Sequence, residues 1–146
     1  MPREIDPQDA SDALAQDAGA IYLDVRSAAE YAQGHAPDAW NIPILHASPQ
    51  GMRPNADFAQ VAAAVLPQDV LLIVGCKSGQ RSAMACQALE QLGFTKAANL
   101  SGGFHGSTDP LGRVLAAGWV RAGLPTTSEP TPGRTWEELK ASAAEI

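Results

Sequence analysis

The sequence predicts an α/β domain whose small, mostly parallel sheet is covered by helices on both faces. Short apolar runs, typical of buried strands, alternate along the chain with segments whose apolar residues recur every three or four positions, as in helices packed on a sheet. The most apolar run, residues 70–74, is Val-Leu-Leu-Ile-Val and has no polar side, which is typical of a strand buried on both faces. A glycine-containing loop and a helical pattern follow it, which completes a strand–loop–helix unit.

The first third of the chain predicts two helices with a strand between them. Asp6 caps a helix over residues 7–17, whose first position is a proline. A short apolar strand over residues 21–25 follows. Ser27 and Glu30 then have the spacing of a capping box, in which each side chain bonds the backbone of the other residue. This pattern begins a short second helix.

The middle of the chain continues the alternation. We expect a strand over residues 40–44 and then a loop over residues 46–54, which is rich in Pro, Gly and Ser. Asn55 caps the next helix, which ends before Pro67. After the central strand and its helix, residues 94–100 form one more strand.

The C-terminal segment, residues 128–146, is predicted to be a linker and a final helix. Pro130 and Pro132 indicate the linker, and Thr135 with Glu138 forms a second capping box. Apolar residues at helical spacing after Thr135 form a narrow stripe. This helix most simply docks on its own domain, and docking on another subunit is the alternative.

Bulk properties exclude several classes of protein. The chain has 146 residues, enough for one domain with its own core, and its net charge of −6 argues against nucleic-acid binding. Its longest apolar run is far shorter than the roughly 20 residues that span a bilayer, and no secretory signal is visible. The two cysteines, Cys76 and Cys86, suit a reducing compartment, so we expect a cytoplasmic protein. No Cys or His cluster has the spacing of metal ligands.

Cys76 is the candidate catalytic residue. It stands at the carboxyl end of the central strand, ahead of a helix that begins near Ser82, and open α/β sheets bind ligands at this end of their strands. Gly79 lets the intervening loop curl, so that backbone N–H groups can turn toward one point. The loop and the helix start supply the other candidate site residues, namely Lys77, Ser78, Gly79, Gln80, Arg81 and Ser82.

These surroundings favour a reactive thiol over an inert one. Only the thiolate is a good nucleophile, and the cations Lys77 and Arg81 together with a helix start stabilise a negative charge on Cys76 or on an anion above it. The pattern indicates a nucleophilic cysteine that acts on an anionic substrate or forms an anionic adduct. The alternative is a buried structural cysteine, because cysteine is among the residue types most often buried.

Three charged residues after the strand over 21–25 have two interpretations. Asp24, Arg26 and Glu30 could be catalytic, but ion pairs that hold a strand end to its helix are commoner, and we favour this for Arg26 and Glu30. Asp24 is assigned a supporting place near the Cys76 loop, where it could brace Arg81. His35 is more simply a structural hydrogen-bonding residue than a general base.

Four stretches, in order and spacing, resemble rhodanese-family sulfurtransferases. Residues 76–82, Cys-Lys-Ser-Gly-Gln-Arg-Ser, resemble the active-site loop of that family. The other stretches are residues 22–26 with Glu30-Tyr31 and Gly34-His35-Ala36, residues 39–43, and residues 100–104 with Trp119 and residues 122–125. The resemblance covers roughly residues 5–127, nearly the whole chain. Each motif alone is weak evidence for the family, but four motifs in the right order are strong evidence.

This resemblance implies a single rhodanese-like domain over residues 1–127 and a sulfurtransferase activity without a cofactor. The Cys76 thiolate would take the outer sulfur of a small anionic donor such as thiosulfate, and a thiol or cyanide would remove it; a protein could also be the acceptor. Lys77 and Arg81 would hold the donor, while Ser78 and Gln80 would shape the loop. Asp24 and Arg26 would support it.

The chain departs from the family pattern at an inserted loop, residues 105–118. The family's glycine pair and its tryptophan are normally a few residues apart. We expect this loop to lie over the mouth of the Cys76 site. The alternative is that it covers the core with Leu111, Val114 and Leu115 packed inward.

Two other functions remain as alternatives. Related phosphatases and arsenate reductases have five residues between Cys and Arg, whereas this chain has four, so its loop is tighter and suits a sulfane sulfur. A non-catalytic rhodanese-like binding module is the other alternative. Such relatives typically lack the cysteine that is present here.

Overall fold

The computed structural model describes residues 3–146 and has a five-stranded sheet at its centre. The strand order is β1-β7-β6-β2-β3, and every neighbouring pair is parallel. The strands are β1 (Arg3–Ile5), β2 (Ile21–Asp24), β3 (Trp40–Asn41), β6 (Leu72–Gly75) and β7 (Ala97–Leu100). The α/β class and the parallel sheet predicted from the sequence are thereby confirmed.

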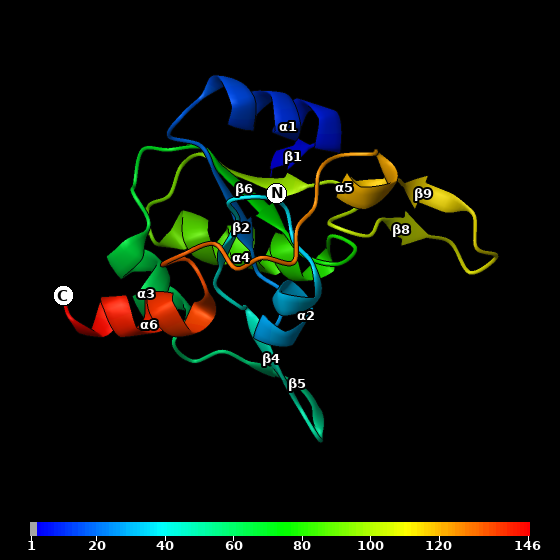
Figure 1. Cartoon of the computed structure of the whole chain (residues 1–146). Helices are drawn as coiled ribbons and strands as arrows, with labels where there is room; N and C mark the ends of the chain where they lie inside the picture. Colours follow the sequence, from blue (N-terminus) through cyan, green and yellow to red (C-terminus); the bar gives the residue numbers. More distant parts are fainter. Residues whose placement is uncertain (1–2) are drawn as a thin grey trace.

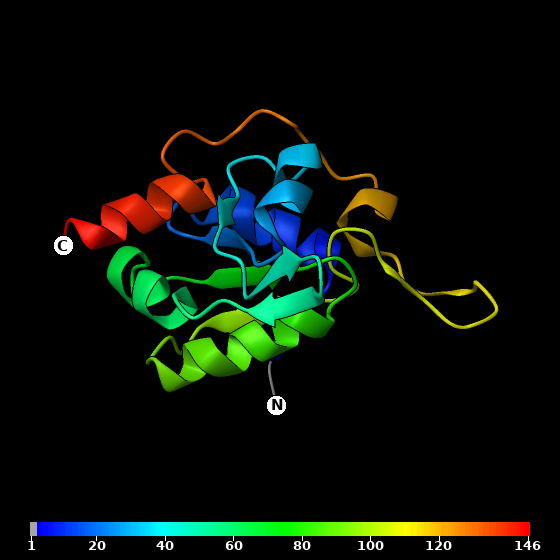
Figure 2. The same cartoon turned by 90° about the horizontal axis from the view of Figure 1, so that it is seen from below.

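Helices cover both faces of this sheet (Figures 1 and 2). One apolar cluster joins the sheet to α3, α4 and α6, and a second cluster joins its other face to α1, α2 and α5. The helices are α1 (Pro7–Gln16), α2 (Ala28–Gln33), α3 (Phe58–Val65), α4 (Gln80–Gln91), α5 (Gly118–Arg121) and α6 (Trp136–Ala144). The predicted covering of both faces is correct.

The predicted helix starts are largely confirmed. The Asp6 carboxylate accepts a hydrogen bond from the Asp9 N–H at 2.8 Å, and Ser27 and Glu30 form both bonds of a capping box. Asn55 does not cap its helix. Its side chain accepts from the Asp57 N–H in a turn that precedes α3, and its amide donates to the Pro43 carbonyl.

Three expectations about strands were incomplete. The edge strand β1 was missed, because three residues are too short to show an alternating pattern. The strand expected over residues 40–44 is only two residues long, and the one expected over residues 94–100 begins at Ala97. In both cases the flanking residues continue as loop.

The loop expected over residues 46–54 is instead a β-hairpin. Strands β4 (Leu45–Ser48) and β5 (Gly51–Pro54) pair antiparallel, and Gly51 turns the chain with φ of 107°. The pairing satisfies backbone groups that composition alone had suggested were solvated. This hairpin follows β3 at the carboxyl edge of the sheet.

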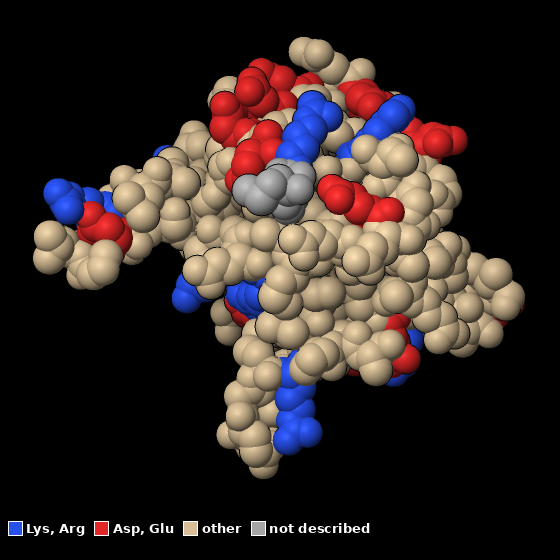
Figure 3. Space-filling view, turned by 180° about the vertical axis from the view of Figure 1, so that it is seen from behind, with Lys and Arg blue, Asp and Glu red and all other residues tan. Residues whose placement is uncertain are grey.

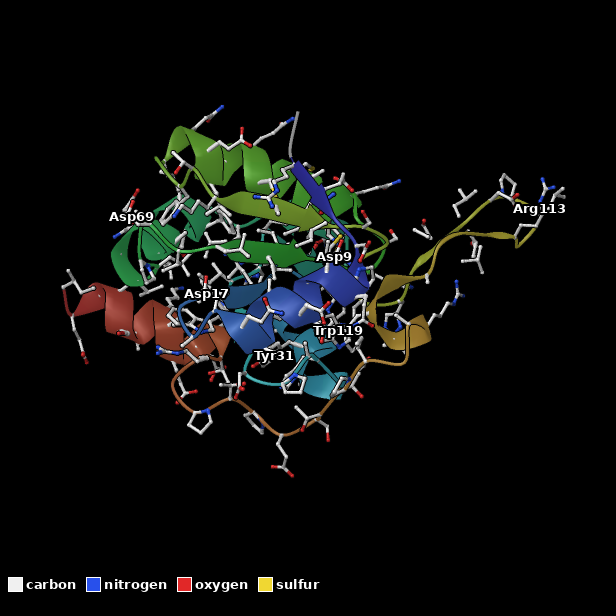
Figure 4. All side chains as sticks on the ribbon, turned by 90° about the horizontal axis from the view of Figure 1, so that it is seen from above. Asp9, Asp17, Tyr31, Asp69, Arg113 and Trp119 are labelled. Atoms are coloured by element: carbon white, nitrogen blue, oxygen red, sulfur yellow. The ribbon has the colours of Figure 1, made fainter. Side chains whose placement is uncertain are left out.

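The inserted loop is a second hairpin, and most of it projects from the body (Figure 1). Its strands are β8 (Ser107–Thr108) and β9 (Val114–Ala116). Arg113 lies at the far end of this projection, and Trp119 lies at its root beside α1 (Figure 4). Leu111, Val114 and Leu115 are exposed, so the alternative in which they pack into the core is wrong.

The C-terminal segment docks on its own chain. Thr127 forms a backbone bridge with His35, and α6 packs against α3 with Trp136 and Leu139 buried in the core. The ring nitrogens of His35 lie 2.7 Å from the Tyr31 carbonyl and 2.9 Å from the Glu129 carbonyl, which agrees with a structural role for this residue. None of the helices within residues 3–146 has the length and apolar character needed to cross a membrane.

Candidate active site

Cys76 lies directly beyond β6, with its side chain only 1 % exposed. The Gly79 N–H donates to Cys76 Sγ at 3.0 Å. Gly79 has φ of 114°, a conformation that favours glycine, and this turns its N–H back toward the sulfur. The helix begins at Gln80 rather than near Ser82, so the loop is only three residues long and the thiol lies against the N-terminal turn of α4.

A network of polar side chains supports the loop from behind. Ser82 Oγ lies 3.3 Å from Cys76 Sγ and 3.2 Å from the Gly79 carbonyl, and it bonds Asn99 Oδ1. Asn99 Nδ2 in turn donates to the Gly79 carbonyl at 3.3 Å and to Glu4 Oε2 at 2.9 Å. Both ends of the Gly79 unit are therefore held, its N–H donating to the sulfur and its carbonyl accepting from Asn99 Nδ2, with the Ser82 hydroxyl close to both Gly79 and Asn99. Sequence patterns did not indicate Asn99 or Glu4.

Replacing Asn99 by leucine is expected to reduce the reactivity of Cys76. Without the amide, the Gly79 carbonyl loses one donor and the loop holds its N–H less firmly against the thiolate. Hydrogen bonds to charged groups contribute about 1.5–3 kcal/mol, so partial loss of the bond from Gly79 corresponds to a fall in rate of about tenfold. The rate of Cys76 alkylation at neutral pH should fall by about that much.

Ser101→Ala is the matched control for Asn99→Leu. Ser101 Oγ also bonds Glu4, at 3.1 Å, but no hydrogen bond joins its side chain to Gly79 within residues 3–146. An equal fall in the alkylation rate in both variants would show that the network does not act through Gly79.

The supporting residues form a buried ion pair. Arg26 contacts the Asp24 carboxylate with Nε at 2.9 Å and Nη2 at 2.7 Å, and both side chains are at most 2 % exposed. Arg26 also donates to the Gly34 carbonyl and lies 4.5 Å from the centre of the Phe104 ring. Asp24 therefore braces Arg26, and the expectation that it could brace Arg81 is wrong.

Arg81 is paired instead with Glu30 on α2. Its two terminal nitrogens contact the two carboxylate oxygens at 2.7 and 3.0 Å, which is a bidentate ion pair. This pair fixes the first turn of α4 to α2. Burial raises the pKa of Glu30, but hydrogen bonds and charge from Arg81, with further bonds from Ser27, outweigh it and lower the pKa to about 2. The guanidinium expected to hold a donor is thus occupied.

Glu30→Gln should destabilise the protein in a pH-dependent way. Because the pKa of Glu30 is lowered from 4.5 to about 2, the pair stabilises the fold fully above about pH 4.5 and progressively less as pH falls toward 2. The stability difference between wild type and Glu30→Gln should be constant above pH 4.5 and shrink below it. Urea unfolding at several pH values measures it, with the exposed Glu145→Gln as control. A difference that did not change with pH would contradict this ion pair.

A pocket of about 340 Å³ opens beside the loop. Its lining residues come from the segment that follows β2 and includes α2, from the loop after β6 and from the root of the inserted hairpin. They are Arg26, Glu30, Gln33, Gly34, Lys77, Phe104 and His105. Burial and the charges of Arg26 and Lys77 hold the pKa of His105 below its ordinary value. Of the charged side chains in this lining, Arg26 and Glu30 are held in ion pairs, whereas Lys77, one of the two predicted cations, forms none within residues 3–146.

Backbone hydrogen bonds hold the root of the inserted hairpin against the cysteine loop. The Phe104 N–H donates to the Cys76 carbonyl at 2.6 Å, and the His105 N–H donates to the Lys77 carbonyl at 2.9 Å. Gly103 has φ of 61°, and a Cβ there would overlap the Cys76 carbonyl oxygen, so only glycine permits this approach. The expectation that the whole insertion covers the site was too broad, because only its root reaches the pocket.

The structure thus brings Cys76, Gly79 and Ser82 together and sets Lys77 on the pocket wall. Gln80 is exposed and Ser78 is half-buried, and neither forms a side-chain hydrogen bond within residues 3–146. Gln33 and His105 were not singled out individually from the sequence. Residues 3–146 contain no group of three His, Cys, Asp or Glu side chains that could hold a metal ion.

Comparison with known proteins agrees with this arrangement. The profile of the family described as Rhodanese-like domain matches residues 6–109. Over 109 residues the chain is 38% identical to "Thiosulfate sulfurtransferase 16, chloroplastic" of Arabidopsis thaliana, which covers 75% of this chain and 81% of that protein. It is 34% identical over 125 residues to "Sulfurtransferase" of Allochromatium vinosum, covering 86% of this chain and 94% of the relative.

A solved structure has the same fold. The crystal structure of Rv0390 from M. tuberculosis superposes with a TM-score of 0.71 at 28% identity, covering 86% of this chain and 97% of that one.

Proposed function

The chain belongs to the rhodanese-like domain family, and from this premise we propose that it is a sulfurtransferase that carries sulfur as a persulfide on Cys76. The donor is a small sulfane-sulfur anion such as thiosulfate, and the acceptor is a thiol or cyanide. A reducing compartment such as the cytoplasm is part of the proposal, since both cysteines are free thiols.

One observation carries this proposal: the Gly79 N–H points at Cys76 Sγ from 3.0 Å, at the N-terminal turn of α4. Such a donor stabilises negative charge on the sulfur and then on an attached persulfide. A purely structural cysteine would need no such donor. The same N–H can serve both halves of the reaction, because each half leaves an anionic sulfur in the loop.

The first half-reaction loads sulfur onto the enzyme. The Cys76 thiolate attacks the outer sulfur of thiosulfate, a new S–S bond forms, and the bond to the sulfonate sulfur breaks with its electron pair leaving as sulfite. In the second half, an acceptor thiolate or cyanide attacks the outer sulfur of the persulfide. The electron pair of the S–S bond returns to Cys76, which becomes a thiolate again, so no oxidant or cofactor is needed.

Lys77 is proposed to attract the donor anion. It lines the pocket and forms no ion pair within residues 3–146, so its positive charge favours an anion in a partly enclosed space where water screens it less. Arg26 supports it from the same lining, but Asp24 already balances its charge. Arg81 has a different role in this proposal. Paired with Glu30, it positions the first turn of α4 rather than binding the donor directly.

Two alternative functions make different predictions. A phosphatase or arsenate reductase is disfavoured by the four-residue spacing between Cys76 and Arg81, and by the engagement of Arg81 with Glu30. A binding module without catalysis would leave the thiol unchanged when donor is added.

Intact mass measurement separates these alternatives. Reduced protein is incubated with thiosulfate, trapped with a small alkylating reagent and weighed. The proposal expects one added sulfur atom per chain, located on Cys76 by peptide mapping. In a parallel sample, cyanide added before the alkylating reagent should remove this sulfur as thiocyanate. A mass that does not change, in protein whose Cys76 is shown to be reduced, would support the binding module. Phosphate release from an aryl phosphate without sulfur uptake would support the phosphatase.

A further inference from the structure

Two hairpins flank the pocket because of the strand order. The pocket is built by the segments that follow β2 and β6, which are neighbours in the sheet, and by the root of the insertion. The strands on either side of this pair are β3 and β7. The β4–β5 hairpin follows β3, and the β8–β9 hairpin follows β7, so in the strand order one hairpin lies on each side of the segments that build the pocket. The two hairpins project from different parts of the body (Figure 1).

Both hairpins expose large apolar side chains to solvent. Leu111 is 79 %, Leu115 is 69 % and Val114 is 55 % exposed on the β8–β9 hairpin, and Met52 is 45 % exposed on β5. Val114 and Leu115 are consecutive strand residues and point to opposite faces, so neither face of the β8–β9 ribbon is covered. A lone two-stranded ribbon is only marginally stable in water, and contact with a partner would bury these side chains.

Positive charge is concentrated on the segments that follow four of the five strands, β2, β3, β6 and β7. These segments are residues 24–34, 42–54, 75–81 and 101–121. Together they carry six Lys or Arg and three Asp or Glu, whereas the rest of the chain carries four and thirteen. Figure 3 shows Lys or Arg side chains on each projecting hairpin, with an acidic side chain beside them on one hairpin, while most acidic side chains in this view lie at its top together with further Lys or Arg side chains.

The acidic residues of these four segments are already paired. Asp24, Glu30 and Asp109 form ion pairs with Arg26, Arg81 and Arg113. Arg53, Lys77 and Arg121 form no ion pair within residues 3–146 and so give these segments a net positive charge. Arg53 is on the β4–β5 hairpin, and Arg121 follows the β8–β9 hairpin on α5. In the strand order, this positive charge thus lies on both sides of the pocket.

We propose that the β4–β5 and β8–β9 hairpins form a docking surface for a protein sulfur acceptor that presents a reduced cysteine within an acidic segment containing apolar residues. The proposal rests on the sulfurtransferase function. The acceptor's carboxylates meet Arg53 and Arg121, and its apolar side chains cover Leu111 and Leu115. Its cysteine enters the pocket between the hairpins.

The transfer step needs nothing beyond the acceptor's own thiolate. That thiolate attacks the outer sulfur of the Cys76 persulfide, which has taken up one proton from solvent after loading. A new S–S bond forms on the acceptor, the bond to Cys76 breaks, and its electron pair returns to Cys76 as the thiolate. The acceptor leaves as a persulfide with the proton, so atoms, charge and electrons balance.

Binding is tested without sulfur chemistry. The probe is a fluorescent peptide of about 16 residues, longer than either hairpin at roughly 3.3 Å per extended residue, with a central Ser in place of Cys and flanking Glu and Leu. A second peptide has Lys for every Glu. Fluorescence anisotropy with the Cys76→Ser protein should show the acidic peptide binding at least tenfold tighter, with affinity falling as salt rises.

Paired variants locate the surface. Leu111→Ser with Leu115→Ser, and Arg53→Glu with Arg121→Glu, should each weaken acidic-peptide binding about tenfold. Ile146→Ser is the control for an exposed apolar residue elsewhere, and Lys96→Glu is the control for a charge reversal at the opposite edge; neither should change affinity. Circular dichroism confirms that each variant is folded.

Kinetics connects the surface to the reaction. With Cys restored to the acidic peptide, discharge of the Cys76 persulfide should slow about tenfold in both hairpin variants. Loading from thiosulfate and discharge to 2-mercaptoethanol should stay within twofold of wild type. Equal slowing with 2-mercaptoethanol would show damage to the site rather than lost docking, and would overturn the proposal.

Three further outcomes test the docking surface. Equal affinity for the acidic and basic peptides overturns the proposal. So does a wild-type dimer in sedimentation equilibrium that dissociates in the Leu111→Ser, Leu115→Ser variant, because the hairpin would then serve a second copy of this chain. If the binding pattern holds but thiosulfate never loads Cys76, the docking surface stands and the sulfurtransferase function fails.

Discussion

Replacing Cys76 by serine is expected to lower sulfur transfer by more than about a thousandfold, because the attacking atom is lost. A serine hydroxyl is not ionised at neutral pH and cannot hold a sulfane sulfur. Steady-state formation of thiocyanate from thiosulfate and cyanide measures this. Unchanged circular dichroism would show that the loss is chemical, since Ser is close to Cys in volume.

Cys86→Ala is the matched control. Cys86 is fully buried on α4, and burial, followed by the charges of Glu90 and Glu4, raises its pKa to about 12. It therefore stays a thiol at neutral pH and takes no part in transfer, so the variant should keep most of its turnover. Equal loss in both variants, with folding intact, would show a two-cysteine mechanism.

The second large effect is expected from Asp24→Ala, on stability. The variant leaves the Arg26 guanidinium buried beside an empty space, with the Gly34 carbonyl and the Phe104 ring as its remaining neighbours. Breaking one side of a buried ion pair costs about 3–5 kcal/mol, a large share of the 5–15 kcal/mol that keeps a domain folded. Urea unfolding at neutral pH should show a correspondingly lower midpoint.

Arg113→Ala is the comparison that tests the role of burial. Arg113 also pairs with a carboxylate, that of Asp109, at 2.7 Å, but its side chain is mostly exposed. Solvent screens such a pair, so the unfolding midpoint should change little. If both variants lowered the midpoint equally, burial would not be what makes the Asp24–Arg26 pair important.

The sequence predicted the elements whose signals are local. The capping box at Ser27, the cap at Asp6 and the uninterrupted apolar run before Cys76 each depend on a few adjacent residues, and all are present in the structure. The position of Cys76 between the end of β6 and the start of α4 follows from the same local pattern. These features could be predicted because neighbouring residues alone determine them.

The missed features depend on residues far apart in the chain. Which carboxylate meets Arg81 is decided by how α2 lies against α4, and Glu30 and Arg81 are 51 residues apart. Asn99 reaches Gly79 only because β7 lies beside β6. The hairpins were read as loops because their pairing satisfies backbone groups rather than burying an apolar face, and so leaves no alternating pattern.

The edge position of β1 has a consequence for how the protein assembles. Glu4 meets Asn99 across 95 residues of chain, and Asn99 holds the Gly79 carbonyl. Closing so long a loop is entropically costly, and distant pairings form late in folding. Strand β1 is synthesised before β7 and pairs only after β7 is available. We expect Cys76 to be less reactive in a nascent or partly folded chain, and its sulfur chemistry to develop only when β1 has paired with β7.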